Sequence, residues 1–159
     1  YGRMRLCILA VGHKLPEWVA KGCAEYIKRM PRELALSVSE IKPEPRGSKN
    51  REQLLAAEKG RLQAALQGFS RIVVLDERGA DLSTLKLAQR LEDWMREGGD
   101  TAFIIGGADG IDESLKQQAH DSIRLSSLTL PHAMARLILC EQLYRAVSVV
   151  KNHPYHREG

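Results

Sequence analysis

Apolar residues follow two patterns that alternate along the chain. In one pattern they are adjacent or spaced by two, as in β-strands, and the run 72–75 is the clearest example. In the other they recur every three or four residues, which predicts amphipathic helices. Strands are predicted over residues 4–11, 34–41, 71–76, 101–105 and 122–125.

Proline, glycine and capping residues set the limits of the predicted helices. Pro16 suits a first helical position, and Pro31 ends that helix. Asp81 or Ser83 can cap the third helix, which Gly98 ends. Helices are predicted over residues 16–30, 54–66, 113–119 and 131–150. One more helix is predicted between the cap at Asp81 or Ser83 and Gly98. Residues 42–51 contain two prolines and a glycine, and are expected to form an exposed basic loop.

Strands that alternate with helices indicate an α/β protein with a mainly parallel sheet and helices on both faces. The 159 residues fit a single domain, which we assign to residues 4–159. Residues 1–3, ahead of Met4, are interpreted as a remnant of cloning. Such sheets bind ligands beyond the carboxyl ends of their strands, so the candidate site comprises the loops after Leu75, Ile105 and Leu125.

Composition narrows the class of protein. No apolar run is long enough to span a bilayer and no secretory signal opens the chain, so a cytoplasmic protein without a membrane partner is expected. Cys7, Cys23 and Cys140 lie far apart in apolar stretches, a pattern typical of buried free thiols. Neither C-x-x-C nor H-E-x-x-H occurs, so no metal site is expected. The net charge of +4 permits a nucleic-acid partner without requiring one.

The most informative local feature is the glycine cluster after the fourth strand, Gly106-Gly-Ala-Asp-Gly110. Three glycines in five residues let a ligand approach the backbone without a Cβ in the way. A tight turn without a ligand is an equally good interpretation. The cluster matches neither a P-loop nor G-x-G-x-x-G, and it follows a late strand, so neither a P-loop nor a Rossmann site is indicated.

A second candidate is the segment Leu125-Ser-Ser-Leu-Thr-Leu-Pro-His132, between the fifth strand and the last helix. Its small hydroxyls, backbone amides and leucines suit a flat and largely neutral ligand such as adenine. Its composition alone favours the alternative, a connecting loop in which Thr129 caps the helix.

The chain ends in a tail that is both aromatic and basic. It holds Asn152, His153, Tyr155, His156 and Arg157 within six residues. Such side chains stack on bases and bind phosphates, as RNA recognition requires. A frayed terminus with solvated side chains is the alternative.

Together these motifs resemble the ribosomal RNA large subunit methyltransferase H family, which are small SPOUT-class enzymes. The resemblance rests on Gly106-Gly, on Leu-Ser-Ser-Leu-Thr-Leu-Pro-His and on the ending Asn-His-Pro-Tyr-His-Arg-Glu. It extends from Met4 over nearly the whole chain and includes the opening Ala-Val-Gly and the Ile-Val-x-Leu-Asp strand.

The resemblance implies a C-terminal deep trefoil knot, an exception to the rule that chains are unknotted, with walls that hold S-adenosylmethionine. It implies a homodimer with an active site shared between subunits. The implied reaction is methylation at N3 of a pseudouridine in 23S rRNA of the assembled ribosome. The family's cofactor contacts fall on Leu75, Gly106, Leu125, Ser126, Ser127, Leu128, Thr129 and Leu130. The chain has Ala108-Asp109 where relatives commonly have Pro-Glu, and Ala133-Met-Ala135 where bulkier residues are usual.

Tyr155, His156 and Arg157 match the substrate side of the family. An imidazole at His156 can accept the imide proton, Arg157 can stabilise the resulting anion or bind phosphate, and Tyr155 can stack on the base. His132, directly after the cofactor loop, is the reserve candidate. Two other interpretations stay open: an RNA-binding or ribosome-binding module without catalysis, and a nucleotide-binding regulator. The intact cofactor loops favour the enzyme.

Overall fold

A five-stranded sheet with all neighbouring strands parallel forms the centre of the computed structural model, which describes residues 3–12 and 14–157. Along the sheet the strand order is β2-β1-β4-β3-β5. The strands are β1 (Leu6–Val11), β2 (Leu36–Ile41), β3 (Arg71–Asp81), β4 (Thr101–Ile105) and β5 (Asp121–Arg124). The parallel pairing confirms the predicted α/β class.

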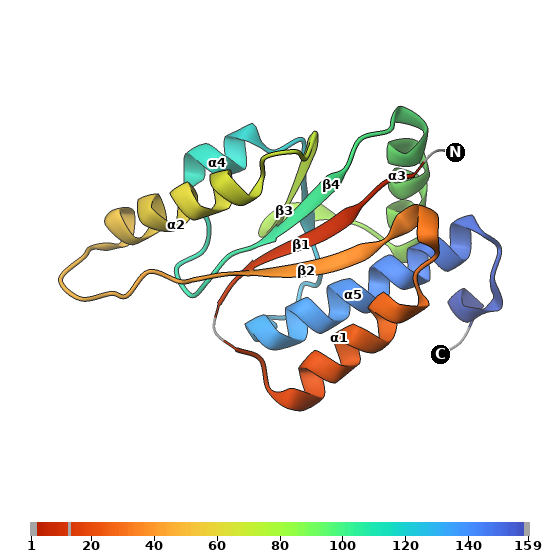
Figure 1. The fold of residues 1–159 in the computed structure, drawn as a ribbon, viewed down its shortest axis with the longest axis horizontal. Helices are drawn as coiled ribbons and strands as arrows, with labels where there is room; N and C mark the ends of the chain where they lie inside the picture. The colour runs from red at the N-terminus through yellow and green to blue at the C-terminus, as the bar shows by residue number, and fades with distance from the viewer. Residues whose placement is uncertain (1–2, 13, 158–159) are drawn as a thin grey trace.

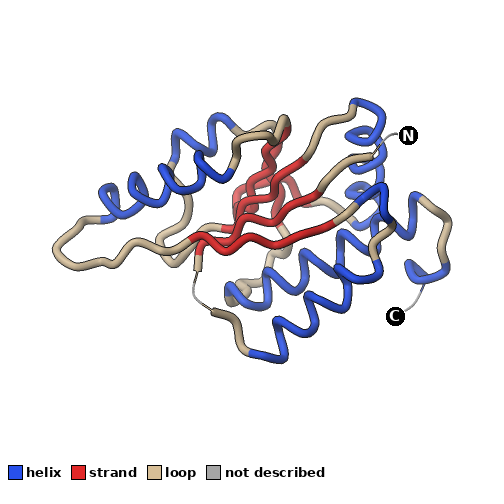
Figure 2. Tube along the Cα trace, viewed as in Figure 1, coloured by secondary structure: helices blue, strands red, loops and turns tan. Residues whose placement is uncertain are grey.

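Helices cover both faces of this sheet (Figure 1; Figure 2). They are α1 (Glu17–Arg29), α2 (Arg51–Ala65), α3 (Thr84–Glu97), α4 (Glu113–Gln118) and α5 (His132–Val150). One face packs against α1, α3 and α5, and the other packs against α2 and α4. Two short 3-10 helices, Arg32–Leu34 and Pro154–Arg157, complete the described chain.

The side chains of each inner strand alternate between two buried layers. In β1, Leu6 and Ile8 face the layer of α1, α3 and α5, whereas Cys7 and Leu9 face the layer of α2 and α4. Every residue of β1 and β4 is buried. Continuous apolar runs in these strands are therefore explained by burial on both faces of the sheet.

Local sequence signals account for several helix limits. Asn50 and Gln53 form a capping box at the start of α2. Ser83 caps α3 by accepting a hydrogen bond from the backbone N–H of Lys86 at 3.2 Å. Gly98 follows α3 with φ of 77°, a left-handed conformation that favours glycine.

The strand β3 is longer than its apolar run predicts. It continues past residue 76 to Asp81, and both Leu75 and Ala80 lie opposite Ile123 of β5, so the residues between them bulge out of register. A Cβ at Gly79 would lie 2.7 Å from the backbone of Ile123, which explains the glycine. The expected loop after Leu75 is therefore a bulged strand, because polar residues within a bulge do not show strand alternation.

Cys7, Cys23 and Cys140 are buried free thiols, as predicted. No helix among the described residues combines the length and apolar character needed to cross a membrane. In that same part of the chain, histidine, cysteine and acidic side chains form no group of three or more that could hold a metal ion.

Candidate functional site

Two of the predicted cofactor segments follow the carboxyl ends of β4 and β5, and Leu75 lies within β3, the strand between them. Because the strands are parallel, the chain leaves β4 after Ile105 and β5 after Arg124 at the same edge of the sheet (Figure 1), and Leu75 pairs with Ile123 close to that edge. Leu75 and Leu125 both pack against the core layer that contains α5. The sheet order therefore brings the predicted positions together from three separate parts of the sequence.

The glycine loop, residues 106–110, is a compact turn after β4. The backbone N–H of Gly110 donates to the carbonyl of Gly107 at 3.0 Å, and Gly110 has φ of 89°. A Cβ at Gly106 would lie 2.6 Å from the carbonyl oxygen of Gly110 and equally close to a side-chain carbon of Ile111. Gly106 is therefore required by the loop itself, since its own backbone occupies the space of a side chain.

The imidazole of His132 connects this loop to α5. Its Nδ1 lies 3.2 Å from the carbonyl oxygen of Gly106, and its Nε2 lies 3.1 Å from Nη2 of Arg136. A carbonyl only accepts and a guanidinium only donates, so Nδ1 carries the proton and Nε2 is the acceptor. Burial and the charge of Arg136 lower the pKa of His132, which keeps this ring neutral.

The guanidinium of Arg136 is buried below the same edge. Its side chain is 1% exposed, and Nη1 lies 3.4 Å from a carboxylate oxygen of Glu40 in β2. Nε of Arg136 has no hydrogen-bond partner among the described residues. A Cβ at Gly12, directly after β1, would lie 3.2 Å from Nε2 of His132, so the chain after β1 also packs against the imidazole. Arg136 and His132 thus join β2, the glycine loop and α5.

The loop between β5 and α5 exposes both hydroxyl and apolar groups. Oγ of Ser126 accepts from the backbone N–H of Leu128 at 2.9 Å, which makes a local turn. Leu128 is 75% exposed, and Ser127 and Thr129 are exposed as well. The residue preceding α5 is Pro131, and no side chain caps the helix. The alternative in which Thr129 caps α5 is therefore wrong, and its hydroxyl is not used by the helix.

The tail docks through Tyr155 at the other end of α5. The Tyr155 hydroxyl lies 3.2 Å from that of Tyr26 and donates to Glu141 at 3.0 Å. The ring packs edge-on against Tyr144 at 4.7 Å, and Arg145 lies over it at 4.8 Å. Burial and these hydrogen bonds raise the pKa of Tyr155. Tyr155 therefore fixes the tail to α1 and α5.

The other two predicted catalytic residues lie close to this docking point. Arg157 is exposed, and the side chain of His156 lies outside the described part of the structure. The 19 residues of α5 separate the tail from the cofactor segments by about 28 Å of helix (Figure 1). Tail and cofactor segments of one chain are therefore not brought together.

Sequence reasoning missed a connection between the glycine loop and the basic loop, residues 42–51. Nη2 of Arg46 lies 2.7 and 2.8 Å from the two carboxylate oxygens of Asp109. Arg51 donates to the backbone carbonyl of Asp109 at 2.9 Å. The only earlier signal was the opposite charge of the two loops, because the partners are 63 and 58 residues apart.

The fold and these strand-end loops place the protein among the SPOUT-class methyltransferases, and a family model described as "Predicted SPOUT methyltransferase" matches residues 4–156. A probable methyltransferase from Bordetella pertussis Tohama I shares the fold with a TM-score of 0.57 at 16% identity, covering 92% of this chain and 95% of that one. A probable methylase family protein from Haemophilus influenzae Rd KW20 has a TM-score of 0.56 at 14% identity over 97% of this chain and 70% of that one.

Curated sequences give the narrower assignment. The chain is 73% identical over 156 residues to ribosomal RNA large subunit methyltransferase H of Dechloromonas aromatica (strain RCB), covering 98% of this chain and all of the relative. It is 59% identical to the protein of the same name from Ralstonia nicotianae, over 97% of this chain and 99% of the relative. The chain belongs to the ribosomal RNA large subunit methyltransferase H family.

Proposed function

We propose that this protein transfers a methyl group from S-adenosylmethionine to N3 of a pseudouridine in 23S rRNA of the assembled ribosome. The assignment to rRNA follows from the names of its curated relatives. The observation that carries the proposal is that the glycine loop and the hydroxyl-rich segment 125–130 follow strands that end at the same edge of the sheet, and that His132, directly after that segment, lies 3.2 Å from the carbonyl oxygen of Gly106. A protein that acts on ribosomes is expected in the cytoplasm.

The residues at this edge fit a methyl donor that contains adenosine. Ser127 and Thr129 keep hydroxyls that the fold does not use as caps, and Leu128 offers an exposed apolar surface. In the glycine loop, Gly106, Gly107 and Gly110 carry no side chain, and the carboxylate of Asp109 binds Arg46. We assign cofactor binding to Leu75, Gly106 and residues 125–130. The trefoil knot expected for this class remains a prediction.

The chemistry requires a deprotonated base and a fixed approach. S-adenosylmethionine supplies an electrophilic methyl group on a sulfonium. His156 would accept the pseudouridine N3–H proton, which would leave the N3 lone pair free to take the methyl group that a bound donor would supply. Arg157 stabilises the imide anion or a neighbouring phosphate. Tyr155 holds this tail in place through Tyr26 and Glu141. His132 orients the glycine loop, because both of its ring nitrogens are already engaged.

The length of α5 supports an active site that is shared between two subunits. A tail about 28 Å of helix away from its own cofactor segments requires the segments of a second subunit. Trp18 is 63% exposed at the start of α1, which follows the carboxyl end of β1, and so offers apolar surface near that edge. Trp94, by contrast, is buried in the core of its own chain. We therefore propose a homodimer with two composite sites.

Two assays test this proposal. Calorimetry with S-adenosylmethionine separates an enzyme from a module that only binds RNA, since the module has no need of the donor. Radiolabelled methyl transfer then compares assembled ribosomes with isolated large subunits, and we expect the ribosomes to be labelled faster. The assignment would be overturned if the protein did not bind the donor, or if neither the ribosomes nor the isolated large subunits were labelled.

Subunit mixing tests the composite site. Gly106→Val subunits keep the tail, and subunits lacking residues 155–159 keep the cofactor segments. Neither variant alone should be active, whereas refolding a mixture of the two should restore part of the activity. A mixture as inactive as its components would show that each site is built within one chain.

A further inference from the structure

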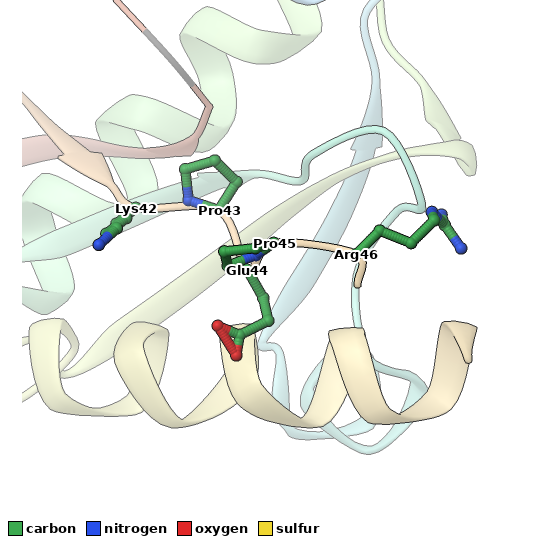
Figure 3. A pocket seen from close by; sticks show the side chains of 5 residues that line it. All are labelled: Lys42, Pro43, Glu44, Pro45 and Arg46. Atoms are coloured by element: carbon green, nitrogen blue, oxygen red, sulfur yellow. The ribbon is translucent and has the colours of Figure 1, made fainter. Parts of the chain in front are cut away.

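The basic loop, residues 42–51, is a structured arm. The backbone N–H of Glu44 donates to the buried carboxylate of Glu58 in α2 at 3.0 Å. Arg61 donates to the carbonyl of Lys42 at 2.9 Å and to the carboxylate of Glu44 at 2.8 Å. Figure 3 shows residues 42–46 crossing above α2, where they line a hollow of about 320 Å³. Residues 42–50 therefore hold a defined path without regular secondary structure, and Arg51, predicted to lie in the loop, is the first residue of α2.

This arm lies beside the proposed methyl-donor site. It follows the carboxyl end of β2, at the same edge as the cofactor segments. Arg46 binds the carboxylate of Asp109 and Arg51 binds its carbonyl, so two contacts hold the arm against the glycine loop. Under the proposed function, the RNA base is presented to that same edge.

The charge of the arm is unbalanced. It carries four cations, Lys42, Arg46, Lys49 and Arg51, against one carboxylate, Glu44. Arg61 binds that carboxylate. Lys42 and Lys49 are exposed, and neither forms an ion pair within the described part of the chain. Two lysines without carboxylate partners, on a fixed loop next to a site for a polyanionic substrate, are suited to phosphates.

We infer that residues 42–51 form a phosphate-binding arm, in which Lys42 and Lys49 contact the RNA backbone and Asp109 holds the arm at the cofactor edge. This inference rests on the proposed function, because the RNA is the proposed substrate. Such contacts are independent of base sequence and position the RNA rather than select the base.

The test uses the full-length protein and purified ribosomes that lack the methylation. The double variant Lys42→Gln/Lys49→Gln removes the two free cations, and Lys21→Gln/Lys28→Gln removes two exposed cations of α1 as a matched control. KM for ribosomes is measured across about 50–200 mM potassium chloride, with S-adenosylmethionine affinity as the check on folding.

We expect the arm variant to raise KM for ribosomes at least about tenfold with kcat and donor affinity unchanged. Each lost phosphate contact should also reduce the slope of log KM against log salt by about 0.7–0.9. The control should match the parent. An arm variant that behaves like the control overturns the inference, and so does a raised KM with the parent's salt slope, which would indicate a ribosomal protein as the partner.

Asp109→Ala separates tethering from simple charge. This change removes one negative charge from the edge, so charge alone predicts tighter RNA binding and a lower KM. Because Arg46 loses its carboxylate partner, the inference predicts a higher KM instead. A lower KM would refute the tether. If the parent itself does not methylate ribosomes, the proposed function fails. If the parent and all variants are active with the same KM, only the inference about the arm fails.

Discussion

Replacing His132 by alanine tests how the cofactor edge is held together. The change removes the hydrogen bond to the Gly106 carbonyl and the acceptor for Nη2 of Arg136. A net hydrogen bond contributes about 1 kcal/mol, and a buried donor left unpaired costs about 1–3 kcal/mol. The free energy of unfolding should therefore fall by about 2–4 kcal/mol, which lowers Tm by about 4–16 °C in a domain of this size.

Two conservative variants separate the two contacts of the ring. In His132→Asn the amide takes the place of Nδ1 and can still donate to Gly106, whereas in His132→Gln it takes the place of Nε2 and can accept from Arg136. We expect Asn to keep the parent's affinity for S-adenosylmethionine and to lose stability. Gln should keep most of the stability and weaken donor affinity about three- to tenfold, the effect of one lost hydrogen bond.

Calorimetry and thermal unfolding give both quantities for each variant. His120→Ala is the matched control, because His120 accepts a hydrogen bond from the Ile72 backbone at the start of β3, away from the cofactor edge. It should leave donor affinity unchanged. If the Asn and Gln variants bind the donor equally well, the contact between His132 and Gly106 does not support the cofactor site, and this reasoning is refuted.

Three further predictions concern the same edge and the tail. The pKa of His132 is lowered below 6.5 in the folded state, so its contribution to the free energy of unfolding is complete above about pH 6.5 and is lost as the pH falls through the lowered value. Tm should therefore drop on acidification, and it should drop less in His132→Gln. Parallel curves of Tm against pH for the two proteins would contradict this. Gly106→Val should abolish donor binding and retain the circular dichroism of the α/β fold. The control Gly60→Val, at a position where a Cβ meets nothing within 4 Å, should bind the donor normally. Unchanged donor affinity in Gly106→Val would remove Gly106 from the site. Deleting residues 155–159 should leave donor affinity within a few-fold but lower methyl transfer by at least about a hundredfold, and Tyr155→Phe should lose much less; a truncated protein at the parent's rate would exclude the tail from catalysis.

The positions of the inner strands were predictable because burial on both faces leaves a direct trace in the sequence. The apolar residues of β1 and β4 are all buried, and their runs identify them without any long-range information. The bulge in β3 left no such trace. Asp76 binds Lys116 of α4 at 3.2 Å, and Gly79 lies against the backbone of Ile123, contacts that only the folded chain creates.

In the candidate site, too, some residues carry a local signal in the sequence and others are defined only by long-range contacts. Gly106 and residues 125–130 were found as motifs, because small residues and hydroxyls at strand ends are a local signal. The link between Arg46 and Asp109 joins distant segments and was not visible. Arg136 was missed, although the sequence holds a signal for it. It lies four residues after His132 and on the same helix face as Cys140 and Leu143, a buried position for a charge that predicts a partner.

The docking of Tyr155 shows a different limit. Its aromatic character suggested stacking on a base, and the same character is satisfied within the chain by Tyr26 and Tyr144. Sequence alone does not distinguish these partners, because both contacts need an exposed ring face at the end of a helix.

Identification of the methylated nucleoside tests the proposed reaction itself. Ribosomes that lack the modification are incubated with the protein and S-adenosylmethionine, and 23S rRNA is digested and analysed by mass spectrometry. We expect one new nucleoside, N3-methylpseudouridine, at a single position, absent when the donor is omitted. A methyl group on another atom or base, or rRNA without any added methyl group, would contradict it.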